Sequence, residues 1–193
     1  MDFFNFPADQ KFPSDAEYEN INYKSFYNAC NNVKPSLIRT NADELTYHLH
    51  VLIRYEIEKD LIEGSINVND LPLIWNEKYY KYLGIKVPND SIGVLQDIHW
   101  SHGSFGYFPT YTLGSFYAAQ FYKKASTEIS DINLKIEKGN TVDLLNWLRK
   151  NIHNHGERYD AKDLCKMLTG EELNFKYFMD YAKNKYSKIY NLD

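Results

Sequence analysis

The sequence has few of the residues that commonly cross-link a small fold. Its 193 residues include only two cysteines, Cys30 and Cys165, which lie far apart and form no CxxC pair. Domains that depend on disulfides carry several cysteines at close spacing. We therefore interpret these two as small buried hydrophobic side chains in a reducing compartment.

Long apolar runs are also missing. No window approaches eighteen consecutive apolar residues, and the N-terminus lacks the basic start and the apolar stretch of a signal peptide. The first absence argues against a membrane span, and the second argues against secretion. We expect a soluble, cytoplasmic protein.

Several signatures of catalysis and of nucleic-acid binding are missing as well. No Gly-rich phosphate loop, nucleophile elbow or HExxH zinc motif occurs in the sequence. The 22 Lys and Arg residues are spread along the chain and, with 26 Asp and Glu residues, leave a net charge of −4. An acidic chain without a basic run matches a phosphate backbone poorly, so no nucleic-acid partner is expected.

Aromatic residues are abundant, at 16 % of the chain with 17 Tyr and 11 Phe. Tyrosine combines an apolar ring with a polar tip, so this bias suits grooves and helix seams that stay partly wet. Four of the phenylalanines, including Phe3, Phe4 and Phe6, fall within residues 2–13. This segment is either an arm folded on its own core or surface meant to pack on a further part of a larger fold.

Apolar residues recur at helical spacing along most of the chain, which predicts an all-α, multi-helical region over residues 1–193. Asp70 is a candidate N-cap, and Gly64 and Gly84 are candidate C-terminal stops. Any strand would be short and near residues 65–68. The predicted helices cover residues 14–33, 41–63, 71–83, 110–126, 141–151, 161–168 and 171–190.

The irregular stretch between Gly84 and Pro109 is the first candidate site, because binding groups concentrate in such loops. Asp97 and His99 are two apart, so the carboxylate could fix the tautomer of the imidazole. His99 and His102 form only a weak metal pattern without a third ligand. Tyr107 and Tyr111 are four apart at the start of a predicted helix, so both hydroxyls could point into one cleft.

The second candidate is the segment 38–43, just before the predicted helix 41–63. Thr40 or Asn41 could cap this helix, and Asp43 complements its positive end. Arg39 could bind a carboxylate in bidentate fashion, and by itself it is as well suited to a structural Asp as to a ligand.

The remaining charged and imidazole groups are given ordinary structural interpretations. The row from Arg54 to Asp60 is interpreted as a solvated helix face. His48 and His50 are two apart on a helix and cannot chelate one ion well. His153 and His155 are interpreted as capping groups at a helix end.

Two stretches carry a resemblance to a known family. Ile38-Arg39-Thr40-Asn41-Ala42-Asp43 resembles the IRxxAD motif of the carboxypeptidase Taq family, and residues 93–100 match its GxxQDxHW motif at every fixed position. The run from Phe105 to Gly114 is similar as well. The resemblance is collinear from about Phe3 to the C-terminus.

The resemblance implies a mostly helical, gluzincin-like peptidase with a deep groove, which removes C-terminal residues from peptides. In that family an HExxH helix and a downstream Glu hold zinc, and zinc with the HExxH Glu activates a water. These groups, with the HPF and DxRxT motifs, belong upstream of the region matched here. We therefore expect a C-terminal portion that holds no zinc by itself and is inactive alone.

Carried over by position, Arg39 would bind the carboxylate of the substrate. His99 would donate a hydrogen bond to the substrate or to the oxyanion, and Asp97 and Gln96 would keep it ordered. The hydroxyls of Tyr107 and Tyr111 would complete the catalytic set. Asp43 is included with the substrate-binding group, although orienting Arg39 or capping a helix suits it better.

The expected partners are peptide C-termini and a complementing N-terminal half that carries HExxH. A homodimer remains open, because members of the family often associate as dimers. The alternative function is a non-catalytic helical module that binds peptides or another protein.

Overall fold

A computed structural model describes residues 22–192, and every described element is helical. The aromatic segment with Phe3, Phe4 and Phe6, and the first part of the predicted helix 14–33, lie outside the described residues. Among residues 22–192, four 3-10 turns, η1 to η4, span Arg39–Asn41, Val68–Asp70, Asp90–Ile92 and His153–His155. The eight α-helices of the described residues are α1 (Tyr23–Cys30), α2 (Tyr47–Ile62), α3 (Leu71–Leu83), α4 (Phe108–Glu128), α5 (Ile132–Glu137), α6 (Val142–Asn151), α7 (Ala161–Thr169) and α8 (Lys176–Tyr190).

The prediction of an all-α fold is confirmed, and the strand suggested near residues 65–68 is wrong. Gly64 adopts a left-handed conformation with φ of 70°, and the chain then turns into the 3-10 helix Val68–Asp70. Asp70 does lie at the N-cap position of α3, but its side chain makes no capping hydrogen bond. Gly84 ends α3 as predicted, because its φ of 70° directs its N–H to the carbonyl of Tyr80.

The described chain divides into two compact units. One comprises Asn31–Gly114, and the other comprises the described residues up to Cys30 together with those from Ser115 onward. We refer to them as the 31–114 unit and the 115–192 unit. Helix α4 begins in the first and continues into the second.

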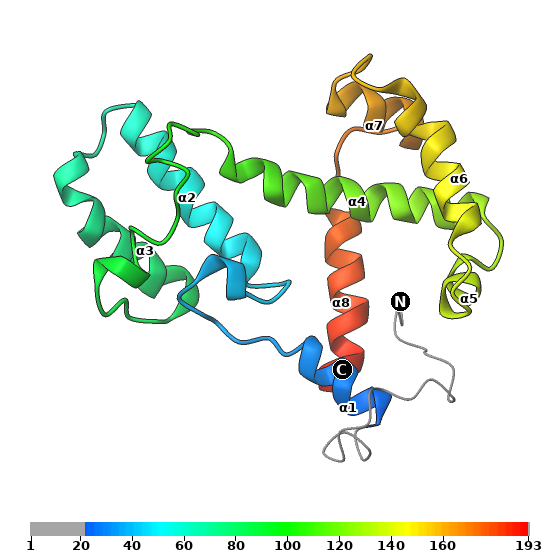
Figure 1. The fold of residues 1–193 in the computed structure, drawn as a ribbon, viewed down its shortest axis with the longest axis horizontal. Helices are drawn as coiled ribbons and strands as arrows, with labels where there is room; N and C mark the ends of the chain where they lie inside the picture. The colour runs from blue at the N-terminus through cyan, green and yellow to red at the C-terminus, as the bar shows by residue number, and fades with distance from the viewer. Residues whose placement is uncertain (1–21, 193) are drawn as a thin grey trace. The chain divides into compact units, whose positions relative to one another are not determined.

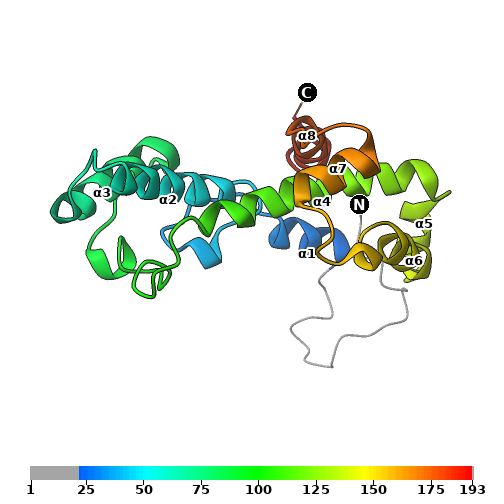
Figure 2. The same ribbon diagram turned by 90° about the horizontal axis from the view of Figure 1, so that it is seen from above.

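The core of the 31–114 unit lies between α2 and α3, which run side by side in both views (Figure 1 and Figure 2). Burial of these apolar and aromatic side chains is the main force that stabilises a helix pair of this kind. The buried residues of this core are Ile53, Ile57, Trp75, Tyr79 and Leu83.

The 115–192 unit has its own apolar cluster of Ala125, Ile132, Ile136 and Trp147.

Cys165 is buried as predicted, whereas Cys30 is exposed, which contradicts the expectation for that residue. Within residues 22–192, no helix is long and apolar enough to cross a membrane.

Candidate functional site

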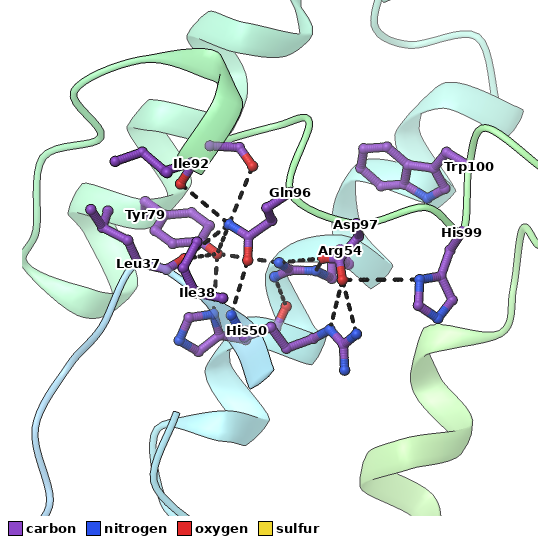
Figure 3. Close-up of polar contacts among 12 residues, drawn as sticks. Leu37, Ile38, His50, Arg54, Tyr79, Ile92, Gln96, Asp97, His99 and Trp100 are labelled. Atoms are coloured by element: carbon purple, nitrogen blue, oxygen red, sulfur yellow. Dashed lines mark hydrogen bonds and ion pairs between the residues drawn. The ribbon is translucent and has the colours of Figure 1, made fainter. Parts of the chain in front are cut away.

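Asp97 joins two arginines that come from different parts of the 31–114 unit. Figure 3 shows Asp97 beside one of them, Arg54. Arg39, in the 3-10 turn before α2, donates from Nε and Nη2 to Oδ1 of Asp97 at 3.0 and 2.9 Å. Arg54, in the middle of α2, donates from Nε to Oδ2 at 2.6 Å. Both carboxylate oxygens are therefore engaged by guanidinium groups, which give the stronger, charge-assisted kind of hydrogen bond.

The two guanidinium groups control the ionisation of Asp97. Burial by itself would raise the pKa of this carboxyl, but the field of Arg54 and the hydrogen bonds from both arginines outweigh it, so the pKa lies below its ordinary value. For Arg39, burial lowers the pKa, and the contacts with Asp97 and Tyr47 more than compensate. Asp97 and Arg39 therefore both stay charged at neutral pH.

Gln96, next to Asp97 in the chain, hydrogen-bonds to the backbone of the segment before α2. Its Oε1 accepts a hydrogen bond from the backbone N–H of Arg39 at 2.9 Å, and its Nε2 donates to the carbonyl of Leu37 at 2.9 Å. The same amide donates to the hydroxyl of Tyr79 at 3.3 Å. Gln96 thus fixes the backbone that carries Arg39, while Asp97 fixes its side chain.

Aromatic groups enclose the guanidinium of Arg39. Its central carbon lies 5.6 Å from the ring centroid of Phe108 and 5.2 Å from that of Tyr111, and its Nη1 donates to the hydroxyl of Tyr47 at 3.3 Å. Three of its five N–H groups are thereby used, so two remain for a ligand. Arg39 is only 8 % exposed, so little of its surface is open to a ligand.

His99 lies beside this cluster, next to the two tyrosines that the sequence analysis singled out. Its Nε2 is 3.2 Å from the hydroxyl of Tyr111, and the Tyr107 and Tyr111 rings meet edge to face with centroids 5.3 Å apart. Nδ1 of His99 has no hydrogen-bond partner and lies 4.0 Å from Oδ1 of Asp97. This distance is longer than a hydrogen bond, so Asp97 acts on the imidazole through its charge.

The environment of His99 favours the neutral imidazole. Desolvation is the largest cause and lowers the pKa, and the positive charges of Arg39 and Arg54 act in the same direction. Asp97 opposes them, but the pKa still lies below its ordinary value. A neutral imidazole can donate a hydrogen bond from one nitrogen, for example to a carbonyl oxygen, and accept one at the other, for example from a hydroxyl.

Asp43 lies at the start of α2, where it accepts hydrogen bonds from the backbone N–H groups of Leu45 and Thr46, each at 2.9 Å. It also accepts from the hydroxyl of Thr46 at 2.7 Å and from the N–H of Lys34 at 3.0 Å. These contacts hold the turn that leads into α2, where Thr46 occupies the N-cap position. The prediction that Thr40 or Asn41 caps this helix is wrong, because both belong to the preceding 3-10 turn.

The interpretation of the row from Arg54 to Asp60 as a solvated face is also wrong for two residues. Arg54 is completely buried and Glu58 is only 4 % exposed. A signal for this was present, because His50, Arg54 and Glu58 follow one another at intervals of four and share one face of α2. The sequence analysis did not combine them into a polar stripe that faces a loop.

The described residues do not fit a zinc site. No group of three His, Cys, Asp or Glu side chains in residues 22–192 is placed to hold a metal ion. Asp97 is engaged on both oxygens by arginines, and Nδ1 of His102 lies 2.9 Å from the hydroxyl of Ser104. A cation beside two guanidinium groups would also be repelled.

A cavity in the 115–192 unit holds none of the candidate residues. Its volume is about 470 Å³, and its lining contains no carboxylate, histidine or cysteine. Lysines, tyrosines and asparagines predominate, among them Lys24, Lys185, Lys188, Tyr122 and Tyr181. The cluster around Asp97 is therefore the stronger candidate for a site with peptide chemistry.

Comparisons with known proteins agree with the motifs in this cluster. A family model described as Carboxypeptidase Taq (M32) metallopeptidase matches residues 3–186. Carboxypeptidase 1 of Bacillus subtilis is 46 % identical over 179 residues, covering 93 % of this chain and 36 % of that protein. Thermostable carboxypeptidase 1 of Thermus thermophilus is 42 % identical over 175 residues, covering 91 % and 34 %.

A solved structure gives the same relationship. The M32 carboxypeptidase from Deinococcus radiodurans R1 matches with a TM-score of 0.89 and 36 % identity, covering 92 % of this chain and 36 % of that chain. The chain thus spans about a third of the length of the curated relatives it matches.

Proposed function

The chain belongs to the carboxypeptidase Taq (M32) family of metallopeptidases, and we propose that its 31–114 unit binds the C-terminal residue of a peptide substrate in a zinc-dependent carboxypeptidase. Arg39 binds the terminal carboxylate of the peptide in this proposal. His99, Tyr107 and Tyr111 lie beside the peptide group that is cleaved.

The proposal depends on the charge balance around Asp97. Two arginines share the carboxylate of Asp97, so these three side chains together carry one formal positive charge. The other buried carboxylate nearby on α2, Glu58, accepts hydrogen bonds from Trp100 and Gly106. The guanidinium of Arg39, with two unused N–H groups, favours an anionic ligand, and a carboxylate matches its planar shape.

The neighbouring groups support a peptide ligand. His99 and Tyr111 hydrogen-bond to each other, so either can redirect its hydrogen bond to a substrate carbonyl oxygen. The hydroxyl of Tyr107 is the second candidate donor, on a residue that is 50 % exposed. Fixed donors of this kind stabilise the negative charge that develops on a carbonyl oxygen during peptide cleavage.

Zinc would supply a polarised water in the intact enzyme. The residues described above do not fit the metal, so in this proposal other parts of the family fold hold it. We therefore propose that this chain binds peptides but does not cleave them alone, and that a complementing chain with HExxH restores cleavage.

Calorimetric titration of the chain with N-acetyl-Ala-Phe-Ala and with the same peptide amidated at its C-terminus tests the carboxylate contact. We expect the amide to bind at least about tenfold more weakly, because a charge-assisted bond is lost. Arg39→Ala should weaken binding of the free acid only. Arg149→Ala, at an exposed position of α6, is the matched control. Equal binding of acid and amide would contradict the proposal.

Catalysis is tested by adding a zinc-loaded protein that contains the HExxH region of a relative. Release of the C-terminal alanine should require both chains and should fall with Arg39→Ala. The alternative, a non-catalytic peptide-binding module, predicts peptide binding without release in a well-folded mixture of the two chains.

A further inference from the structure

Glu58 connects helix α2 to both ends of a short turn in the candidate site. Its Oε1 accepts a hydrogen bond from Nε1 of Trp100 at 2.8 Å, and its Oε2 accepts one from the backbone N–H of Gly106 at 3.2 Å. Glu58 is only 4 % exposed. Burying a carboxylate is costly unless hydrogen bonds compensate, and here each oxygen has one.

Each of the two anchored residues is the sequence neighbour of a candidate catalytic group. Trp100 directly follows His99, and Gly106 directly precedes Tyr107. Between these points the chain turns back on itself, with the N–H of Ser104 donating to the carbonyl of His99 at 2.8 Å. Gly106 has φ of 78°, a conformation that other residues adopt with strain, and its N–H is thereby available to Glu58.

The anchors on Glu58 therefore hold both ends of the turn that separates His99 from Tyr107. Those two rings are stacked with centroids 6.0 Å apart. Trp100 is itself held by an edge contact with Trp75 of α3, with centroids 6.0 Å apart. The 93–107 loop is thus attached to α2 at three points: Asp97 contacts Arg54, and Trp100 and Gly106 contact Glu58.

We propose that Glu58 is a positioning residue, which sets the separation of His99 and Tyr107 and so shapes the site that receives the C-terminal residue of the substrate. Its effect on peptide binding rests on the proposed function. Its effect on the geometry of His99 does not. A carboxylate suits this task because it accepts on both oxygens, whereas the amide of glutamine has one acceptor and would present N–H to a donor.

The test compares Glu58→Ala and Glu58→Gln with Glu56→Gln in the full 193-residue chain. Glu56 is the matched control, since it lies on the same helix and accepts hydrogen bonds from Lys78 and Tyr82 of α3, without contact to the loop. The first readout is an NMR titration of the His99 imidazole. The charged groups that act on it are Asp97, Arg39, His102 and Arg54, and all three variants retain them.

We expect Glu58→Ala to raise the pKa of His99 toward 6.5, because burial is the largest cause of its depression and the released turn admits water. Glu58→Gln should have a smaller effect in the same direction, and Glu56→Gln should have none. Thermal unfolding of each variant establishes that it is folded. If Glu58→Ala does not fold, the pKa of His99 in Glu58→Gln tests the proposal instead. If neither Glu58 variant folds, the residue is a stability residue and the proposal is overturned.

The second readout is affinity for N-acetyl-Ala-Phe-Ala, which we expect to fall about tenfold in Glu58→Ala and about threefold in Glu58→Gln. A folded Glu58→Ala variant with an unchanged His99 titration overturns the positioning role. An altered titration in a chain that binds no peptide supports the positioning role and contradicts the proposed function, so the two failures are distinguishable.

Discussion

Arg54 and Asp97 form a contact between the interior of a helix and a loop 43 residues later in the chain: Nε of Arg54 lies 2.6 Å from Oδ2 of Asp97. Arg54 has no exposed surface, and its Nη1 and Nη2 donate to the carbonyl of His50 and the hydroxyl of Tyr79. The central carbon of Arg54 also lies 4.6 Å from the ring centroid of Trp75. Through these contacts Arg54 links α2, α3 and the loop that carries His99.

Asp97→Asn should destabilise the chain strongly. It leaves two guanidinium groups close together without their shared anion, and breaking a buried ion pair costs about 3–5 kcal/mol. Urea unfolding should show a lower midpoint with an unchanged slope. Asp90→Asn, at an exposed position of the 3-10 helix Asp90–Ile92, is the control for removing one carboxylate. A shift no larger than that of the control would contradict the role of Asp97.

His50 should make stability depend on pH between about 4 and 6.5. It is completely buried, and desolvation followed by the charges of Arg54 and Arg39 lowers its pKa from 6.5 to about 4. Between these values the unfolded chain binds the proton and the folded chain does not, so stability falls as pH falls through this range. The total loss is about 3 kcal/mol.

Urea unfolding of His50→Gln at several pH values tests this dependence. We expect the variant to lose less stability than the parent chain between pH 6.5 and 4. His102→Gln, which removes an exposed imidazole, is the control. Parallel stability curves for His50→Gln and the parent would refute the assignment.

Tyr111→Phe should affect ligand binding more than stability. The substitution removes the hydroxyl that lies 3.2 Å from Nε2 of His99. The other ring nitrogen of His99, Nδ1, already has no hydrogen-bond partner. The lost bond should cost about 1 kcal/mol of stability, and affinity for N-acetyl-Ala-Phe-Ala should fall about tenfold. Tyr80→Phe, on a residue of α3 that is 60 % exposed, is the control for removing a hydroxyl. Unchanged peptide affinity would remove Tyr111 from the proposed site.

Two glycine substitutions should have opposite effects. Gly84→Ala forces alanine to adopt φ of 70° at the end of α3, which should lower the stability by about 1 kcal/mol. The added Cβ would meet no atom within 4 Å, so this cost comes from the backbone conformation alone. Gly114→Ala, within α4, also meets open space and should stabilise the helix by up to about 1 kcal/mol. Thermal melts measure both, and a shift of the same sign in the two variants would contradict this account.

Helices with strong local signals could be predicted from the sequence to within one or two residues. Helix α3 has the predicted bounds of 71 and 83, because its apolar spacing and the following Gly84 are local features. Helix α5 was missed, since six residues are too few to establish a periodic pattern. Helix α2 begins at Tyr47 and not at residue 41, because Arg39–Asn41 form a 3-10 turn and Asp43 stabilises a further turn before the helix.

The sequence by itself determined the all-α class, the family through two collinear motifs, and the grouping of Gln96, Asp97, His99, Tyr107 and Tyr111 near one loop. Only the tertiary structure decided that Asp97 is shared by Arg39 and Arg54, and that Glu58 lies beneath the same loop. The physical reason is that a charged residue on a helix is predicted to be solvent-exposed unless a buried partner for its charge is known. The partners of Arg54 and Glu58 in the loop are 42 to 48 residues away in sequence, and only folding brings them within hydrogen-bond distance.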